Sequence, residues 1–439
     1  MTSFFERLGL NRPELRAWAM YDWANSGFMT TIITAVFPVY YASTAAAGLS
    51  SSEATFKYSV ATTIALAITA VTAPVLGAIA DYAAMKKRLL FAFQLMGLLA
   101  TAAMVFIYEG DWRLALILFV VANIGISGAF TFYDSLLPHI AAPQELDRVS
   151  SAGYALGYLG GGLLLALNMV WLARPHWFGF ADTGAAARAA FFSVAVWWAV
   201  FSIPLFRHVP EPPAAGGPAR PTGLKLLGVG FSQLAGTLRE LARFRNALLL
   251  LAAFLVYNDG INTIIRMATV YGAEVGIPGK HMILAVLMIQ FVGAPFAFLF
   301  GRIAGRIGAK RAVFLALAVY AGISVLGYFM HATWQFYLLG FLVGTVQGGS
   351  QALSRSLFAS MIPKERSSEF FAFWGVFEKF AGILGPAVFA YAIGRTGSSR
   401  VAVLSVIVFF VAGALLLTLV DVERGQAAAR EAEAQAGAA

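Results

Sequence analysis

The amino-acid sequence predicts an all-α membrane protein with twelve transmembrane helices in two pseudo-symmetric halves of six. Three observations support this fold class. Of the 439 residues, 59% are hydrophobic and 12% are charged, whereas soluble domains usually carry about 25% charged residues. The apolar residues form runs of roughly twenty, the length of a helix that spans the bilayer core. Short motifs also recur in the same order in the two halves of the chain.

Twelve apolar runs are the predicted spans. In the first half they cover residues 15–43, 55–82, 88–108, 112–138, 148–172 and 187–207. In the second half they cover residues 245–272, 280–305, 310–330, 334–360, 366–394 and 398–421. The first and seventh runs contain more polar residues than the others. The predicted units are an N-terminal six-helix half (1–207), a linker (208–243), a C-terminal six-helix half (244–423) and a tail (424–439).

The linker and the tail differ in composition from the spans. Residues 210–223 are rich in Pro and Gly, which indicates a loop. Residues 224–243 place Leu and Phe at steps of three and four, which predicts one apolar stripe on a helix. We expect this helix to lie along the inner membrane surface or to pack on the bundle. The tail is rich in Ala, Glu and Gln, and we expect it to be disordered or a frayed helix.

The basic residues predict the orientation. Most of the 31 Lys and Arg residues precede the first span, lie in the linker or fall in loops on the same side. Short loops with an excess of Lys and Arg face the cytoplasm. We therefore expect a multi-pass protein of the cytoplasmic (inner) membrane with both termini cytoplasmic. Because the basic residues lie in loops between spans, the net charge of +9 does not indicate binding of nucleic acid.

Several kinds of chemistry have no support in the sequence. The absence of cysteine excludes disulfides and thiolate metal sites. The five histidines form no metal motif, and Gly-x-Ser-x-Gly and Gly-Lys-Ser/Thr motifs are missing. The first apolar run is too long for the core of a signal peptide. We therefore expect no cofactor, no metal, no cleaved leader and no enzymatic activity, and a membrane-embedded transferase is the least supported function.

Three features recur in register between the halves. Gly77-x-x-x-Asp81 and a basic cluster follow the second span, and a similar loop follows the eighth. The basic residues of the first loop are Lys86, Lys87 and Arg88, and the residues of the second loop are Gly301, Arg306, Lys310 and Arg311. Asp147-Arg-Val-Ser-Ser after the fourth span parallels Glu365-Arg-Ser-Ser after the tenth. Asp22-x-x-Asn25 in the first span parallels Asp259-x-x-Asn262 in the seventh. Such repeats indicate duplicated halves, a feature of secondary transporters.

These motifs resemble those of a known group of proteins. The loop from Gly77 to Arg88 resembles the loop signature of the major facilitator superfamily. Tyr21-Asp-Trp-Ala-Asn25, Asp134-Ser-Leu-Leu-Pro138 and Ser150-Ser-Ala-Gly153-Tyr resemble, more narrowly, the "unknown major facilitator" or vacuole effluxer (autophagy-22-like) family. The resemblance implies the twelve-helix major facilitator fold, transport of a small solute, and amino-acid efflux as one substrate class.

The chain departs from the loop signature at three positions. Tyr82 and Ala84 stand where the superfamily usually has a basic residue and Gly, and Gly305 stands where the second copy usually has Asp. If charges in these two loops close a cytoplasmic gate, Asp81 is the only acidic residue of that gate. The resemblance, together with helix-dipole electrostatics, implies that Asp81 faces the positive N-terminus of the eleventh span and the basic cluster, and so holds the cytoplasmic side closed.

Ionisable side chains inside spans are costly and usually functional. The predicted spans contain Asp22, Asp134, Asp259, Arg266, Arg355, Glu378 and Lys379. The resemblance implies that spans 1, 4, 7 and 10 line a central cavity, and each of these carries one such charge. They are the candidates for the substrate or proton pathway. Because Asp134 and Arg355 lie near the cytoplasmic ends of their spans, a gate or an interfacial salt bridge is an equal interpretation for both.

The other candidates also have two interpretations. Asp259, near the middle of its span, is the leading candidate for contact with substrate or proton. Arg266 lies two turns further on the same face, where it could bind a carboxylate or extend to the outer interface. Glu378 is a candidate proton carrier or a partner of a neighbouring helix. Asn25 and Asn262 could complete a site or bond between helices.

The leading interpretation is a secondary transporter whose halves rock about a site near the membrane midplane. We expect proton coupling, a monomer in membrane lipid and a small-molecule solute as the partner. A receptor or a lipid scramblase on the same fold is the alternative. The glycines from Gly153 to Gly162 give small-xxx-small spacing, which predicts a close helix crossing in the fifth span.

Overall fold

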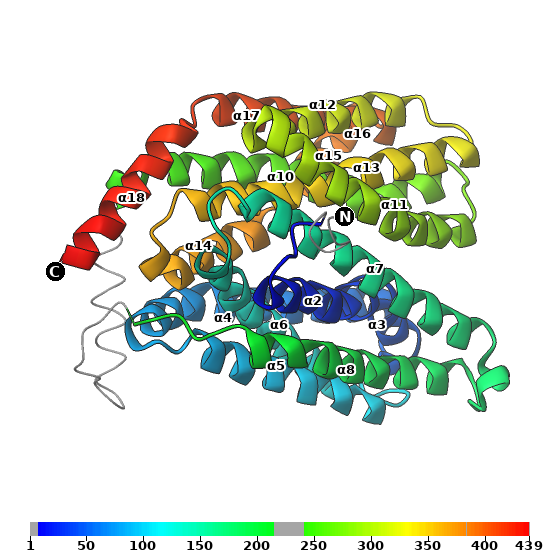
Figure 1. The fold of residues 1–439 in the computed structure, drawn as a ribbon. Helices are drawn as coiled ribbons and strands as arrows, with labels where there is room; N and C mark the ends of the chain where they lie inside the picture. Colours follow the sequence, from blue (N-terminus) through cyan, green and yellow to red (C-terminus); the bar gives the residue numbers. More distant parts are fainter. Residues whose placement is uncertain (1–7, 215–240, 383, 439) are drawn as a thin grey trace, which may run out of the picture.

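The computed structural model describes residues 8–214, 241–382 and 384–438. Its helical segments correspond to the twelve predicted spans, and no strand occurs in these ranges. Figure 1 shows the helices as two groups, with α2 to α8 in one and α10 to α17 in the other. Each group is one half of the chain, so the predicted division into two halves of helices matches the arrangement in space.

The first half begins with a helix that changes its winding. Pro13 opens α2, where a missing backbone donor costs nothing. The span runs from α2 into a π-helical stretch, Met29–Ala35, and then into a short α-helix. The bounds of the first half are α2 (Pro13–Phe28), α3 (Val36–Tyr40), α4 (Ser51–Ala83), α5 (Lys86–Ala103), α6 (Trp112–Ile140), α7 (Leu146–Ala173) and α8 (Thr183–His208).

The second half contains two spans that are made of two helices each. Span 11 consists of α14 and α15, and span 12 consists of α16 and α17. The bounds are α10 (Arg245–Glu274), α11 (Gly279–Ile307), α12 (Ala309–Tyr328), α13 (Thr333–Ser360), α14 (Ser367–Phe380), α15 (Leu384–Thr396), α16 (Ser399–Ser405), α17 (Ile407–Thr418) and α18 (Val422–Ala438). A single residue, Gly308 at φ 86°, turns the chain between α11 and α12, a conformation that glycine adopts without strain.

Eleven of the described helical segments are long and apolar enough to cross a membrane. The remaining predicted span, α13, has the length for it with 28 residues, but it carries several Gln, Ser and Thr side chains. Many of its polar residues are buried, as expected for a helix that faces other helices rather than lipid.

The tail is a helix rather than a disordered segment. Glu433 in α18 accepts a hydrogen bond from the backbone of Lys364, and Gln435 accepts one from Arg243. Ala429 is buried. Of the two alternatives expected for residues 424–439, the structure has the helix, because Ala and Glu favour helix and the bundle supplies a surface for packing. The helix predicted at 224–243 falls mostly on residues 215–240, which lie outside the described residues.

One end of the bundle is called the linker side here, because residues 209–214 end there. It carries the loops at 84–85, 141–145 and 361–366 together with α18, and it is at the left in Figure 1. A 2.6 Å ion pair between Arg12 and Glu145 ties the start of α2 to the loop between α6 and α7 on this side. The other end is called the opposite side.

The two halves meet on the linker side through a pair of equivalent contacts. Gly77 in α4 packs against Ser368 at the start of α14, where an added Cβ would lie 2.6 Å from a backbone oxygen. Gly301 in α11 packs against Ser151 in α7, where an added Cβ would lie 2.8 Å from the serine Cβ. The repeated glycines and Ser-Ser pairs of the sequence therefore form matching helix crossings, as a duplicated fold requires.

The glycines of α7 allow α2 to approach closely. An added Cβ at Gly160 would lie 2.5 Å from the backbone oxygen of Trp23, and one at Gly157 would lie 2.6 Å from Ser26 Oγ. Both distances are below van der Waals contact, so a side chain would force the helices apart. The predicted close crossing of the fifth span is confirmed.

We predict that Gly160→Ala lowers the unfolding temperature in detergent, because overpacking a tight contact typically costs about 1–3 kcal/mol. Gly322→Ala in α12 is the matched control, since no atom lies within 4 Å of its added Cβ. The control should be neutral or slightly stabilising. Equal unfolding temperatures for the two variants, measured by thermal scanning, would contradict the proposed packing.

Candidate functional site

One polar connection between the halves centres on Arg355 of α13. Its Nη1 donates to Asp134 Oδ1 of α6 at 3.0 Å, and its Nη2 donates to Asp22 Oδ2 of α2 at 3.3 Å. Its Nε and Nη2 also donate to Ser150 of α7, at 3.0 Å to Oγ and 3.1 Å to the backbone oxygen. The arginine is 2% exposed. One guanidinium from the second half is thus held by three helices of the first.

Aromatic rings fix the geometry of this cluster. The guanidinium carbon lies 4.8 Å from the Trp18 ring and 4.5 Å from the Tyr154 ring, which are cation–π distances. Trp18 stacks on Tyr133 with ring centroids 4.6 Å apart, and Trp18 Nε1 donates to the backbone oxygen of Tyr133. These contacts join α2 to α6, so Asp22 and Asp134 are held at a fixed separation around the arginine.

The cluster is unbalanced in charge. Two carboxylates share one guanidinium, and all three groups are buried. Because removing one partner of a buried ion pair typically costs about 3–5 kcal/mol, the halves cannot separate here without hydration or neutralisation of these groups. The contact also needs the glycine of α7, since an added Cβ at Gly153 would lie 2.4 Å from Asp22 Oδ2.

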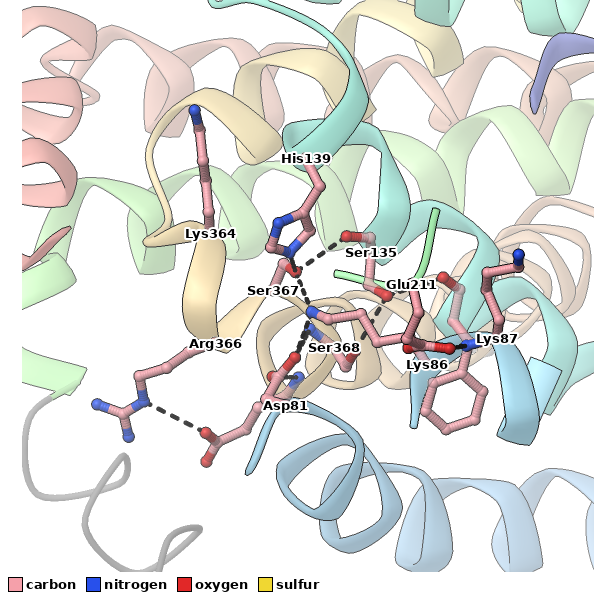
Figure 2. Close-up of polar contacts among 12 residues, drawn as sticks. Asp81, Lys86, Lys87, Ser135, His139, Glu211, Lys364, Arg366, Ser367 and Ser368 are labelled. Atoms are coloured by element: carbon pink, nitrogen blue, oxygen red, sulfur yellow. Dashed lines mark hydrogen bonds and ion pairs between the residues drawn. The ribbon is translucent and has the colours of Figure 1, made fainter. Parts of the chain in front are cut away.

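A second connection joins Asp81 to the start of α14, as Figure 2 shows. Asp81 Oδ1 accepts from the backbone N–H of Ser368 at 3.1 Å, and Oδ2 accepts from that of Glu369 at 2.9 Å. Lys86 forms a buried ion pair with Asp81 and donates to Ser367 Oγ at 2.7 Å. A carboxylate at a helix N-terminus is stabilised by the unpaired N–H groups and the helix dipole. The contact that the sequence predicted for Asp81 is present.

Polar residues of α6 complete this second connection. Ser367 Oγ donates to the backbone oxygen of Ser135 at 2.9 Å, and Ser368 Oγ donates to Ser135 Oγ at 3.0 Å (Figure 2). His139 Nε2 lies 3.1 Å from Ser367 Oγ. Ser135 and His139 were not among the predicted site residues, although the Ser-Ser pair that they contact is part of a repeated motif.

The other basic residues of the first loop have different surroundings. Lys87 donates to the backbone oxygens of Phe206 and Val209, and its own backbone N–H donates to Glu211 Oε2 at 3.0 Å. Burial raises the pKa of Glu211, and the bond from Lys87 opposes this shift. Figure 2 shows Lys87 and Glu211 beside the Asp81 cluster. Arg88 is exposed.

The second loop is not equivalent to the first in its charges. Lys310 Nζ donates to the backbone oxygens of Thr418 at 3.1 Å and Val420 at 2.6 Å, so it ties α12 to the end of α17 within the second half. Arg306 and Arg311 are exposed. Of the two loops, the first therefore provides the carboxylate contact between the halves.

Span 11 is broken between α14 and α15, and Asp259 of α10 contacts this break. Its carboxylate accepts from the backbone N–H groups of Leu384 at 3.0 Å and Gly385 at 2.7 Å, at the start of α15. Asn262 and Arg266 donate to the backbone oxygens of Ala381 at 3.3 Å and Gly382 at 3.4 Å, just after α14. These three side chains satisfy backbone groups that the break exposes, which is essential inside a membrane.

The structure thus separates the predicted pathway residues into two groups. Asp22, Asp134 and Arg355 meet on the linker side, whereas Asp259, Asn262 and Arg266 gather at the break in span 11. Asn25 is buried next to the first group, and its Nδ2 has no partner among the described residues. Glu378 belongs to a cavity that also reaches Asp134. Within the described ranges, no cluster of three potential metal ligands occurs.

Comparison with known proteins identifies the family. The model of the family described as "Vacuole effluxer Atg22 like" matches residues 57–430. The chain belongs to this family.

Two relatives of this chain come from different organisms. The chain is 36% identical over 417 residues to "Uncharacterized MFS-type transporter YxiO" of Bacillus subtilis (strain 168), which covers 93% of this chain and 94% of the relative. It is 24% identical over 437 residues to "Autophagy-related protein 22" of Coccidioides immitis (strain RS), which covers 82% of this chain and 72% of the relative.

Solved structures with a similar fold are also transporters of the major facilitator superfamily. The proton:xylose symporter XylE superposes with a TM-score of 0.69 at 14% identity, covering 97% of this chain and 98% of that chain. FucP in the outward conformation superposes with a TM-score of 0.65 at 10% identity, covering 94% and 99%. The Atg22-like chain is therefore a multi-pass membrane protein with the twelve-helix, two-half fold of this superfamily.

We predict that Asp81→Asn loosens the linker side of this Atg22-like protein. Asparagine offers one acceptor oxygen in place of two and leaves the buried Lys86 without its ion pair. The chain has no cysteine, so a single Ser151→Cys reporter at the buried α7–α11 crossing measures opening through its rate of alkylation. We expect at least about a tenfold faster rate, which corresponds to a shift of 1.4 kcal/mol.

The control for this experiment is Asp111→Asn, in a loop on the opposite side, where the carboxylate accepts from the backbone of Tyr108 at 2.9 Å. It should leave the rate of alkylation unchanged. If Asp81→Asn also leaves it unchanged, Asp81 does not contribute to closure.

Proposed function

We propose that the chain is a secondary active transporter that moves a small solute by alternating access and couples this movement to protons. The observation that carries the proposal is the burial of Arg355, from the second half, between Asp22 and Asp134 of the first half. Rocking of two halves about a shared site requires a contact that closes one side and can be broken. The Arg355 cluster can close one side because its groups are packed together. It can also be broken, because its bonds depend on charges.

The side on which the two halves are joined supports the assignment of the structure to one state of the transport cycle. The hydrogen bonds that connect the halves through Arg355, Asp81 and Ser367 gather on the linker side. We propose that this side is cytoplasmic, because the basic loops lie there. The structure then represents a state closed to the cytoplasm.

The charges of the cluster support the proposal of proton coupling. With both carboxylates ionised, Asp22, Asp134 and Arg355 together carry one uncompensated negative charge in a buried place. A proton bound to either carboxylate would remove one of the two ionic attractions that hold Arg355. We propose that this step weakens the contact between the halves and allows the cytoplasmic side to open, since a charge loses its stabilisation when its partner is neutralised.

Amino acids in the efflux direction are the substrate class that we propose to test first. The description of the family as a vacuole effluxer supports the direction. We further propose that the protein acts as a monomer in the cytoplasmic membrane, with the transport pathway between the two repeated halves of one chain.

The experiment is solute uptake into proteoliposomes, with and without an imposed pH gradient, for a mixture of amino acids read out by mass spectrometry. Wild type should show flux that depends on the gradient. Asp134→Asn should reduce this flux at least about tenfold, as expected when about 1.4 kcal/mol of a required interaction is lost. Asp111→Asn is the matched control and should retain the wild-type flux.

Each outcome bears on a separate part of the proposal. Flux that ignores the pH gradient would contradict proton coupling and leave transport intact. Flux of other metabolites from an extract, without amino acids, would contradict the substrate class. No flux of any solute from either mixture would contradict transport itself.

A further inference from the structure

A small polar cavity lies between α4, α6 and α14, at the boundary between the two halves. Its polar lining consists of Thr69, Ser127, Thr131, Asp134, Glu378 and Lys379. The space open to the centre of a water-sized sphere is about 10 Å³, and one water needs roughly 10–15 Å³ on this measure. The cavity therefore has room for a single water molecule and for no larger solute.

The lining offers the hydrogen-bond partners of a buried water, which are usually about two to four. Thr131 Oγ donates to the backbone oxygen of Ser127 at 3.4 Å, so the hydroxyl oxygen keeps a lone pair that can accept from water. Asp134 of the first half and Glu378 of the second half line the same space. A water in this cavity therefore has a hydroxyl group and one carboxyl group from each half as partners.

Glu378 is a carboxyl group deep in the membrane without a bonded partner. It lies 11 residues after Ser367, the first residue of α14, which is about 17 Å along a helix that rises 1.5 Å per residue. In the described part of the chain, its side chain makes no hydrogen bond or ion pair. A lone carboxylate at this depth is costly, and a bound proton removes this cost. Glu378 is therefore suited to carry a proton.

Glu378 has charged groups around it on both sides of the boundary. Lys379, its neighbour on α14, lines the same cavity, as does Asp134 of α6. An electrostatic interaction also links Glu378 to Tyr154 of α7, whose ring centre lies 4.5 Å from the guanidinium carbon of Arg355. The α4 residues in the lining carry no charge, and no described residue of α10 lines the cavity. The cavity thus connects Glu378 to one carboxylate of the Arg355 cluster.

The two carboxyl groups differ in exposure. Glu378 is half-buried, whereas Asp134 is 8% exposed and accepts from Arg355 at 3.0 Å. This order is expected of a route on which Glu378 receives a proton and Asp134 is its buried acceptor.

We propose that the cavity holds one water molecule, through which Glu378 passes a proton to Asp134. The inference rests on the proposed proton coupling and names the group that delivers the proton to the Arg355 cluster. The O–H bond of Glu378 breaks, the water gives up one of its own protons as it accepts this one, and an O–H bond forms on Asp134. A carboxyl group can transfer a proton through one water. The ammonium group of Lys379 stabilises the carboxylate left on Glu378, and protonated Asp134 loses its ionic attraction to Arg355.

The test is the rate at which the linker side opens after a drop in pH. A fluorophore pair is attached at Pro143→Cys and Arg302→Cys, two exposed sites on the linker side that belong to different halves. The chain has no cysteine, so only these two sites are labelled. Energy transfer between the fluorophores is followed by stopped flow on the purified protein, without any solute.

The labelled protein should open at acid pH, because protonation of Asp134 weakens the contact between the halves. Glu378→Gln should reach the same final energy transfer at least about tenfold more slowly, because a positioned proton-transfer group commonly contributes a factor of about 10² or more. Glu378→Asp keeps a carboxyl group and should open faster than Glu378→Gln. Thr131→Val should also slow opening, because it removes a hydroxyl partner of the water.

The matched controls are Glu53→Gln and Thr63→Val, at exposed positions of α4. Thr63 Oγ donates to the backbone oxygen of Ser59 at 2.9 Å, a bond like that of Thr131 but outside the cavity. Both controls should open at the unchanged rate.

An unchanged rate in Glu378→Gln overturns the relay and leaves proton coupling at the Arg355 cluster standing. If Glu378→Asp is as slow as Glu378→Gln, or if the controls are equally slow, the role of Glu378 is structural and the relay is also overturned. Should Glu378→Gln fail to fold, Thr131→Val decides, and an unchanged rate in that variant overturns the relay. A labelled protein that does not open at acid pH contradicts proton coupling itself, and the relay with it.

Discussion

The contact on which the rest of the account depends is a single buried guanidinium. Arg355 belongs to one half of the molecule, and its two carboxylate partners belong to the other. A charge buried at this depth has no stable alternative partner in lipid, so the two halves are held together wherever this group is unhydrated. The contact owes its strength to charge, because two carboxylates bind one guanidinium. A purely apolar interface would close the path without any means of control.

Helix α14 connects this contact to the other features of the second half. Its N-terminus receives the carboxylate of Asp81, and its last turn carries Glu378 and Lys379. Its C-terminal end lies at the break in span 11, where Asp259 holds the start of α15. Asp81 and Asp259 therefore bind the start of α14 and the start of α15, and the bonds of Asp259 satisfy backbone groups at the discontinuity inside the membrane.

The sequence was sufficient for the fold class, because apolar length and repeated motifs are properties of local segments. The contact of Asp81 was also predicted, through helix-dipole electrostatics and the resemblance of its loop to a known loop signature. The sequence left two alternatives for the tail, where packing against Lys364 and Arg243 decides between helix and disorder. The break in span 11 was missed because its apolar pattern continues through Gly382, so the partners of Asp259 could not be foreseen. Long-range pairing of this kind depends on tertiary geometry, which helical periodicity does not encode.

Distances between spin labels test the central claim most directly. One pair, at Pro143 and Arg302, spans the halves on the linker side, and another, at Glu109 and Lys280, spans them on the opposite side. If Arg355 holds the linker side closed, Arg355→Gln should lengthen the first distance and shorten the second, because rocking halves open one side as they close the other. Two unchanged distances, or two that lengthen together, would contradict the account, since the first result removes the role of Arg355 and the second indicates loosening without alternation.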